Sequence, residues 1–449
     1  MSVMRVQVWA EMNEPARAAL FARGLDDIFD PALRESIGAL IDDVRLRGDA
    51  AVCDALARFD GIELAPSDLR VTDDEIASAR VSDAVDAAID DAIEHLRAFN
   101  EQQRSRLGDW SFESEPGLTV GEKLTPISSA GLFTPSGKAS YPSVTYQLAV
   151  PAIVAGVPQI VVVVPPVPGG SGEVDPAVLT VCRKLGITTA NGHGVFRVNG
   201  PAGIAALGFG TESIPKVRKV IGPGSPAVTL AQVEMQRHGV ATVMLLGPTE
   251  SIVIADRSAD PVRLASDLLI EAEHGTDTSV VLITDDADTA RATDVELAAQ
   301  LAELPAPRAE AAAAALGRNG GCVLVDDLDT AVAIANEYAP EHLQVAVADD
   351  RVDGVVAVLV NAGEILIGQH TPFSAANFVI GCPASLPTSG FAHVSSGVTA
   401  ASFLKRTAVA RADAAAIERM TPSVVALADH EGFPAHAAAL RRRSQREPA

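Results

Sequence analysis

The spacing of apolar positions divides the chain into a helical first part and a later part built from short apolar runs. Between residues 31 and 106, apolar side chains recur every three or four positions, which is the period of amphipathic helices. After residue 118, runs of Val and Ile bounded by Gly and Pro predict strands at 160–164, 240–246, 251–255, 279–284, 323–325 and 355–360. A helix is expected at 301–316. Short strands that alternate with helices predict an α/β fold with a parallel sheet covered by helices.

The most apolar segment, residues 150–166, is interrupted by Pro151, Pro158 and Gln159. It is also shorter than the roughly 20 residues that a membrane-spanning helix needs. We therefore interpret it as a buried helix followed by a strand, and we expect no contact with a membrane. The N-terminal residues lack the basic and apolar regions of a secretory signal, which favours a cytoplasmic location.

The charge balance argues against one large class of partner. The chain has 449 residues, with 35 Lys and Arg against 58 Asp and Glu, and its net charge is −23. A surface this acidic repels a phosphate backbone, so no nucleic-acid partner is expected. The cysteines show no C-x-x-C pairing and are interpreted as reduced thiols; they are Cys53, Cys182, Cys322 and Cys382.

Glycine patterns supply a weak candidate for an anion site. No G-x-G-x-x-G sequence is present, so the usual dinucleotide fingerprint is missing. The segment 222–226, Gly-Pro-Gly-Ser-Pro, follows a short apolar run and opens onto a helix expected at 228–236. Backbone amides at the start of that helix would face the loop and favour an anion. A plain turn remains the alternative interpretation.

Two acidic–histidine pairs carry candidate chemistry. Glu271 and His274 are three positions apart in a helical pattern, so they share one face and are able to bind a metal, although such pairs also occur on solvated surfaces. Glu341 and His342 place a carboxylate beside an imidazole, as general acid–base catalysis requires, although this dipeptide is also common. His436 is by default a surface residue.

The order of several short motifs along the chain resembles the histidinol dehydrogenase family. The resemblance extends over roughly residues 30 to 440, and its blocks follow one another in the family's order. They are 131–137, 204–217, 221–224, 266–275, 339–343, 386–390, 395–397 and 403–407.

The resemblance implies an NAD-dependent, zinc-containing homodimer that oxidises an alcohol to an aldehyde and then to a carboxylate. It implies two incomplete Rossmann-like parallel-sheet domains, a helical N-terminal segment and a C-terminal segment swapped onto the partner subunit. The expected boundaries are 1–24 for the N-terminal segment, 25–132 plus 249–395 for the domain with the metal and catalytic residues, 133–248 for the cofactor domain, and 396–449 for the swapped segment.

The resemblance also implies a set of zinc ligands. They are Glu271, His274, Asn377 and, reaching in from the other chain, His436. The family has Gln at the first position and Asp at the third. The exchange keeps two imidazoles, one carboxylate and one amide, so zinc is expected to be retained, with Asn377 as the weakest ligand because amide oxygens bind zinc poorly.

The remaining site residues follow from the same resemblance. His342 is expected to be the general base for each hydride transfer, and Glu341 to activate the water that adds to the aldehyde. The substrate-binding positions are Ser143, Thr249, Glu431 and Ala384, the last of which replaces a substrate-contacting His of the family. The cofactor-binding positions are Phe133, Ala202 and Ser225, which replace a Tyr, a Gln and an Asn.

These replacements favour a small polar alcohol other than histidinol as the substrate. One alternative is a true L-histidinol dehydrogenase of histidine biosynthesis. The alternative from another class is a non-catalytic ligand-binding descendant, which would have no need of a base beside a metal site.

Overall fold

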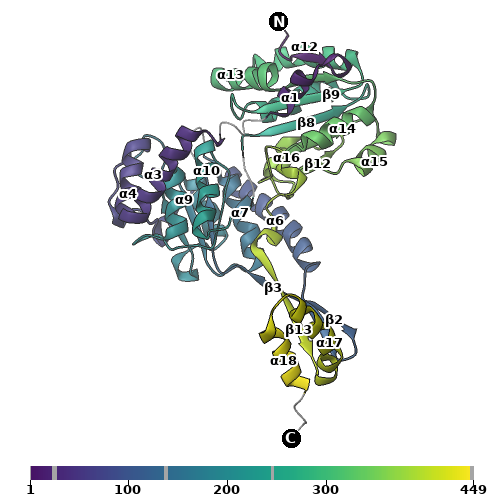
Figure 1. Cartoon of the computed structure of the whole chain (residues 1–449). Coiled ribbons are helices and arrows are strands. Elements are labelled where there is room, and N and C mark those ends of the chain that lie inside the picture. The colour runs from purple at the N-terminus through teal and green to yellow at the C-terminus, as the bar shows by residue number, and fades with distance from the viewer. Residues whose placement is uncertain (1, 23–27, 136–139, 244–246, 445–449) are drawn as a thin grey trace. The chain divides into compact units, whose positions relative to one another are not determined.

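The computed structural model describes residues 2–22, 28–135, 140–243 and 247–444, and the chain forms two compact units (Figure 1). The first unit consists of Met1–Glu101 and Ile127–Phe403, and the second of Gln102–Pro126 and Leu404–Ala449. Parallel sheets covered by helices confirm the α/β class. Within the described residues, no helix has both the length and the apolar character to cross a bilayer.

A six-stranded parallel sheet in the first unit has the order β1-β10-β9-β8-β11-β12. Apart from β1, this is the order of a doubly wound Rossmann-type sheet. The strands are β1 (Val6–Val8), β8 (Glu250–Ala255), β9 (Ser279–Thr284), β10 (Gly321–Leu324), β11 (His342–Ala346) and β12 (Glu364–Ile367).

Helices cover both faces of this sheet, because alternate strand residues point to opposite sides. Val253 and Ala255 pack in one apolar cluster with helices α11 (Pro261–Ala272), α12 (Ala287–Leu301), α13 (Ala306–Ala314) and α16 (Phe373–Phe378). Ile252 and Ile254 pack on the other side with α1 (Glu14–Phe21), α14 (Leu328–Tyr338) and α15 (Asp349–Val358). Apolar residues on both faces explain why these strands appear in the sequence as unbroken Val and Ile runs.

A four-stranded parallel sheet, in the order β6-β5-β4-β7, also lies in the first unit. Its strands are β4 (Ala130–Phe133), β5 (Ile160–Val164), β6 (Gly194–Arg197) and β7 (Lys219–Ile221). Its helices are α7 (Pro142–Ala155), α8 (Pro176–Lys184), α9 (Gly200–Phe209) and α10 (Pro226–Met235). The predicted helix and strand within 150–166 are therefore confirmed as the end of α7 and β5.

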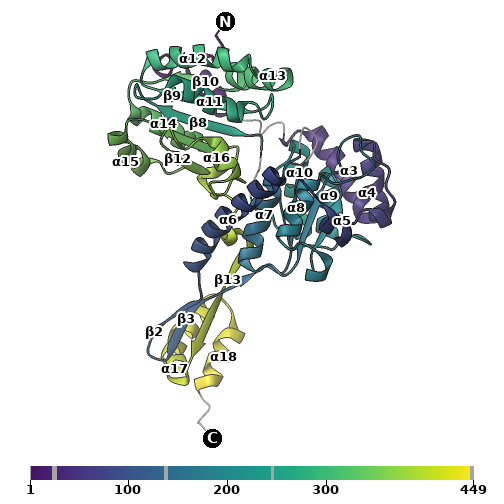
Figure 2. The ribbon, with the colours of Figure 1, turned by 180° about the vertical axis from the view of Figure 1, so that it is seen from behind.

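The predicted helical region 31–106 is confirmed as α3 (Pro31–Arg47), α4 (Asp49–Asp60), α5 (Asp73–Ser78) and α6 (Asp83–Ser105). Figure 2 shows α3 and α4 beside α9 and α10, and the four helices share one apolar cluster that includes Ile37, Ile41 and Ile204. The expected domain boundaries instead group 25–132 with 249–395. The difference arises because pairing between distant segments leaves no local trace in the sequence. The expected boundary after residue 24 lies outside the described residues.

Three expected elements differ from the structure. Residues 355–360 are no strand but include the end of helix α15, in which Val352 and Val355 are buried at helical spacing while Val358 is exposed. In the run 240–246, Ala241 makes only an isolated bridge to Lys219, and residues 244–246 lie outside the described residues. The helix expected at 301–316 begins at Ala306, after the N-cap Pro305.

The second unit contains an antiparallel sheet in the order β13-β3-β2 and two helices. The strands are β2 (Trp110–Glu115), β3 (Leu118–Pro126) and β13 (Leu404–Ala412), and the helices are α17 (Ala414–His430) and α18 (Pro434–Ser444). Several large apolar side chains of this unit are exposed, including Trp110, Phe112 and Leu427. Such an apolar surface is typical of a segment that packs against another protein chain. The swapped position of 396–449 stays a prediction.

All four cysteines are free thiols, as the sequence indicates. Cys182 and Cys322 are buried, and desolvation raises the pKa of each thiol to about 12. These thiols are therefore packing residues and poor nucleophiles.

Candidate active site

The Glu341–His342 pair lies at the amino edge of the six-stranded sheet. Helix α14 ends at Tyr338, Ala339 adopts a left-handed conformation with φ of 50°, and Pro340 prevents any continuation of the helix. The chain then enters β11 directly at His342. The side chains of Glu341 and His342 are 11% and 4% exposed, so the local sequence places a carboxylate and an imidazole together in a nearly water-free position.

Hydrogen bonds hold both members of this pair. His342 Nδ1 lies 2.6 Å from Oε1 of Glu364, and its Nε2 lies 3.8 Å from Oε1 of Glu341. The backbone N–H of Glu250 donates to Glu341 Oε2 over 3.2 Å. The ring of Phe373 meets the His342 imidazole edge to face, with 5.8 Å between the ring centres. The imidazole is therefore fixed on its Nδ1 side and on one ring face.

Burial and neighbouring carboxylates shift the pKa values of both groups. Desolvation raises the pKa of Glu341 to about 8, with further increases from Glu271 and Glu250, although His342 opposes the shift. Desolvation would lower the pKa of His342, but the negative charges of Glu271, Glu341 and Glu364 outweigh it and raise the pKa to about 10. Burial and the surrounding carboxylates therefore hold the pKa of both groups above the values of an isolated carboxyl and an isolated imidazole.

Three of the four expected metal ligands meet in this unit. Glu271 is the penultimate residue of α11, and because α11 returns to the amino edge of the sheet, its end lies close to the start of β11. Asn377, on α16, donates from Nδ2 to Glu271 Oε1 over 2.7 Å. His274 Nδ1 lies 3.4 Å from Glu271 Oε2. The structure thus brings together Glu271, His274 and Asn377, which lie up to 106 positions apart in the sequence.

The polar atoms of this group suit a divalent cation. Glu271 is only 1% exposed on its side chain, and its Oε2 accepts no hydrogen bond from any described residue. His274 Nδ1 lies 3.1 Å and 3.2 Å from the carbonyl oxygens of Ile270 and Glu271. A ring that donates through Nδ1 keeps its lone pair on Nε2, the form in which histidine ligates zinc.

The full ligand set is larger than the group this unit supplies. Within the described residues, no three His, Cys, Asp or Glu side chains cluster closely enough to hold a metal ion. Asn377 adds an amide to the Glu271–His274 pair, and the fourth expected ligand, His436, belongs to the second unit. The residues present fit zinc, with Glu271 as the strongest ligand.

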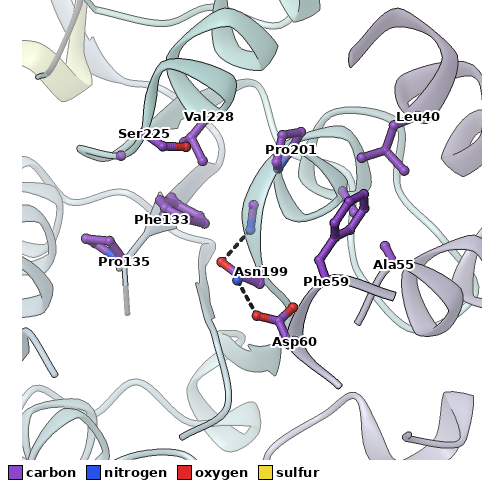
Figure 3. A pocket seen from close by; sticks show the side chains of 13 residues that line it. Leu40, Ala55, Phe59, Asp60, Phe133, Pro135, Asn199, Pro201, Ser225 and Val228 are labelled. Carbon is purple, nitrogen blue, oxygen red and sulfur yellow. Dashed lines mark hydrogen bonds between the residues drawn. The ribbon is translucent and has the colours of Figure 1, made fainter. Parts of the chain in front are cut away.

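A cavity of about 270 Å³ opens at the carboxyl edge of the four-stranded sheet (Figure 3). It is lined by all three expected cofactor positions, Phe133, Ala202 and Ser225, which come from the ends of different strands and the helices that follow them. The carboxyl edge of a parallel sheet is where dinucleotides bind in Rossmann-type domains. The Glu341–His342 pair thus lies at the amino edge of the six-stranded sheet, whereas this cavity lies at the carboxyl edge of the four-stranded sheet.

Glycines and helix ends shape this cavity. A Cβ on Gly222 would lie 2.1 Å from the carbonyl oxygen of Phe133, so only glycine allows the loop after β7 to approach β4. Helix α10 begins at Pro226, immediately after Ser225, close to the start expected from the sequence. The N-terminus of α9 also faces the cavity, and Asn199 accepts a hydrogen bond from Gly200 N over 2.7 Å. Two helix N-termini at one cavity favour an anionic ligand such as a phosphate.

One carboxylate faces the cavity from the end of α4. Asp60 Oδ1 accepts a hydrogen bond from Asn199 Nδ2 over 2.5 Å, as Figure 3 shows. Burial raises the pKa of the Asp60 carboxyl, and the Asn199 hydrogen bond opposes that shift. Phe59, Leu40 and Ala55 form an apolar wall nearby.

The expected substrate positions are divided between the units. Thr249 precedes Glu250, whose N–H holds Glu341, and Ser143 lies in the first turn of α7. The backbone N–H of Ala384 donates over 3.2 Å to Oε1 of Gln147, which lies on α7 together with Ser143. Glu431 is the C-cap of α17 in the second unit, the unit that also carries His436. Their contacts with a substrate stay predictions.

Comparison with known proteins identifies the family. The family model for histidinol dehydrogenase matches residues 27–444. A histidinol dehydrogenase of Rhizobium meliloti is 42% identical over 404 residues, which cover 89% of each chain. The crystal structure of histidinol dehydrogenase from Elizabethkingia anophelis has a TM-score of 0.90, 31% identity, and covers 99% of this chain and 98% of its own. The chain belongs to the histidinol dehydrogenase family.

A histidinol dehydrogenase homolog of Cereibacter sphaeroides is also similar, with 37% identity over 438 residues, 97% of this chain and 96% of the relative. Members of the histidinol dehydrogenase family are NAD-dependent oxidoreductases that act on CH–OH groups, and this chain is one of them. The family is in general zinc-containing, and its members are homodimers that act on small molecules.

The sequence analysis missed two buried carboxylates that lie beside the Glu341–His342 pair. Glu364 contacts His342, and Glu250 lies beside Glu341. Each is the first residue of a strand that is otherwise apolar, with the sequences EILI and ESIVIA. An acidic residue that opens a buried strand is rarely left without a role. That pattern, applied along the chain, would have singled out both residues.

The raised pKa of His342 predicts an alkaline enzyme. A general base must be unprotonated, so we expect kcat/KM to increase with pH between about 7 and 10, beyond the range of an ordinary imidazole. The measurement is the pH profile of kcat/KM at saturating cofactor. An acid limb centred near pH 6.5 would contradict the influence of the surrounding carboxylates.

Proposed function

We propose that this protein oxidises L-histidinol to L-histidine in two NAD-dependent steps through an aldehyde that stays bound. The observation that carries the proposal is the buried Glu341–His342 couple in a chain that is 42% identical to a protein named histidinol dehydrogenase. The comparisons therefore favour the alternative considered from the sequence over the substrate first expected there.

The couple supplies the proton transfers of both steps. His342 Nε2 takes the proton of the substrate hydroxyl as the hydride leaves its carbon, which gives the aldehyde. Glu341 then accepts a proton from the water that adds to the aldehyde, while His342 returns its proton to the aldehyde oxygen, which completes the hydrate and frees Nε2. His342 then takes a hydroxyl proton of the hydrate as the second hydride leaves. Each oxidation removes one hydride and one proton, so two NAD molecules are reduced per substrate.

The expected ligands position the substrate beside the couple. Zinc held by Glu271, His274 and Asn377, with His436 of the partner subunit, would stabilise negative charge on the reacting oxygen. The cavity beside Phe133 would hold NAD, which would supply the hydride acceptor. The apolar wall at Phe59 suits a flat base, and the starts of α9 and α10 suit a phosphate.

A second candidate is a small polar alcohol without an imidazole. Ala384, at the position expected to contact the imidazole of histidinol, presents only a methyl group, and its N–H is engaged by Gln147. A substrate with a compact polar group in place of the ring would need no side chain there. The reaction steps at Glu341 and His342 would be unchanged.

One experiment separates these two substrates. Purified protein is first assayed for stoichiometric zinc and then supplied with NAD and L-histidinol, amino alcohols, hydroxy acids or sulfonated diols. Formation of histidine with two NADH per histidinol supports the proposal. Turnover of another alcohol with none of histidinol supports the second candidate, and no turnover of any alcohol by zinc-loaded protein contradicts both.

We also propose that Asp60 makes the enzyme select NAD over NADP. Its carboxylate faces the cavity and would accept hydrogen bonds from ribose hydroxyls but repel a 2′-phosphate. We expect Asp60→Asn to improve NADP binding relative to NAD by about tenfold, measured as dissociation constants by cofactor fluorescence. Asp54→Asn, an exposed carboxylate on the same helix, is the control and should leave the ratio unchanged. An unchanged ratio in Asp60→Asn would assign cofactor choice to other residues.

A further inference from the structure

We propose that Glu364 is the positioning residue that fixes the tautomer and the orientation of His342. This inference rests on the proposed function, in which His342 acts as the base. It adds a second carboxylate, on the opposite side of the imidazole from Glu341, to the group that prepares the base for catalysis.

The strand register places Glu364 beside His342. Strands β11 and β12 are parallel neighbours, and His342 pairs directly with Glu364 as the first residue of each strand. Paired residues of adjacent parallel strands point to the same face of the sheet. The side chain of Glu364 is therefore delivered to the imidazole by the backbone of the sheet, and the placement does not depend on a mobile loop.

The turn into β12 fixes this register. Gly363 N donates to Pro340 O over 2.9 Å, and Glu364 N donates to Glu341 O over 3.1 Å. A Cβ on Gly363 would lie 2.5 Å from the carbonyl oxygen of Glu341. Only glycine permits the backbone before Glu364 to lie this close to the catalytic couple.

The hydrogen bond between the two side chains is short and buried. Nδ1 of His342 and Oε1 of Glu364 are 2.6 Å apart, and the side chains are 4% and 6% exposed. The other oxygen of Glu364, Oε2, is buried without a hydrogen-bond partner among the described residues. The carboxylate is thus committed to His342. A buried ion pair contributes little stability compared with apolar residues of the same volume, so a purely structural role does not account for it.

The consequence for the chemistry concerns the two ring nitrogens. An acceptor at Nδ1 keeps the proton of the neutral ring there and leaves the lone pair on Nε2. Nε2 faces Glu341, where the substrate oxygen and the added water must react. When Nε2 takes the substrate proton, the ring becomes positive, and the Glu364 carboxylate at Nδ1 stabilises that charge.

Other titratable groups also face this imidazole. They are Glu341 from β11, Glu271 from α11 and, next to Glu341, Glu250 from β8; Cys382 lies near Glu364. Glu364 differs from the others in that it makes the hydrogen bond to Nδ1. Its removal should therefore change the tautomer as well as the charge.

The test compares two substitutions in the zinc-loaded enzyme. We expect Glu364→Ala to lower kcat by about 10- to 100-fold with little change in KM, because the base loses its tautomer while the substrate contacts remain. Glu364→Gln still offers an oxygen to Nδ1–H, so it should retain more activity. Because Gln lacks the charge, the acid limb of its pH profile should move to lower pH by about one unit.

The control is Asp256→Asn, which removes a buried carboxylate immediately after β8 that binds Ser258 and Arg351. It should leave the pH profile unchanged even if stability decreases. A kcat and a pH profile like those of the unmodified enzyme in Glu364→Ala would overturn the proposal.

A readout without turnover separates this inference from the proposed function. Nitrogen-15 NMR of histidine-labelled protein is recorded at a pH above the pKa of His342, with His342→Asn used to assign the resonance. It should show the proton of the neutral ring on Nδ1, and this preference should be lost in Glu364→Ala. If this result is obtained while no alcohol is oxidised, only the proposed function fails. A proton on Nε2 in the unmodified protein would refute the positioning role itself.

Discussion

His342→Asn should slow both oxidations by about 100-fold or more, because each step transfers a proton to the same imidazole. The ring is buried against Phe373 and bonded to Glu364, and no other described imidazole lies in this group of contacts with Glu341. Single-turnover kinetics started from the alcohol and, separately, from the aldehyde would measure the two steps.

The matched control is His393→Asn. His393 lies in the same unit and bonds through its ring to Asn361 and to the carbonyl oxygen of Glu337, as a purely structural histidine does. It should keep normal kinetics. Thermal unfolding of His342→Asn must accompany the kinetics, because Glu364 Oε1 loses its hydrogen bond to His342 Nδ1. A loss confined to the first oxidation would show that His342 does not serve both steps.

The neighbouring carboxylate separates the two oxidations. Glu341→Gln keeps the size of the side chain and an oxygen for Glu250 N–H, but it removes the group that accepts a proton from water. The second oxidation needs a hydrated aldehyde, so this variant should release or accumulate aldehyde, with about one NADH per substrate. Equal losses in both steps, together with lower stability, would instead mean that Glu341 only orders the loop after Pro340.

The sequence predicted those parts of the fold whose signals are local. The runs 160–164 and 279–284 are bounded by polar residues and turns, and their strands have those same limits. Residues 355–360 were wrongly predicted as a strand, because a short Val-rich run is compatible both with a buried strand and with the buried face of a helix. Val352, outside the run, reveals the helix only when it is counted with Val355.

The candidate site was predicted in the same uneven way. Glu271 and His274 are three positions apart and could be found from spacing, whereas Asn377 is 106 positions from Glu271 and was found only through the family resemblance. Glu364 reaches His342 through strand pairing, which fixes a contact between residues 22 positions apart that neither local spacing nor the known motifs indicate. Contacts made by sheet register are thus the part that requires the structure.

Mixing two inactive variants should restore activity if each active site is shared between subunits. His342→Asn removes the base from the first unit, and His436→Ala removes the expected ligand on the second unit. In a mixed dimer with swapped C-terminal segments, one site receives both defects and the other receives neither. Random reassociation makes about half of the dimers mixed, so about a quarter of the normal activity should return.

The design distinguishes a shared site from a site within one chain. If His436 served its own subunit, every site of a mixed dimer would carry one defect, and mixing would restore nothing. Native mass spectrometry of the same mixture supplies the control for exchange, because the two variants differ in mass and the fraction of mixed dimers reports how completely the subunits reassociate. Restored activity should also depend on protein concentration, since it exists only in the dimer. Full activity of His436→Ala alone would remove this residue from the metal site and leave Glu271, His274 and Asn377 to hold zinc without it.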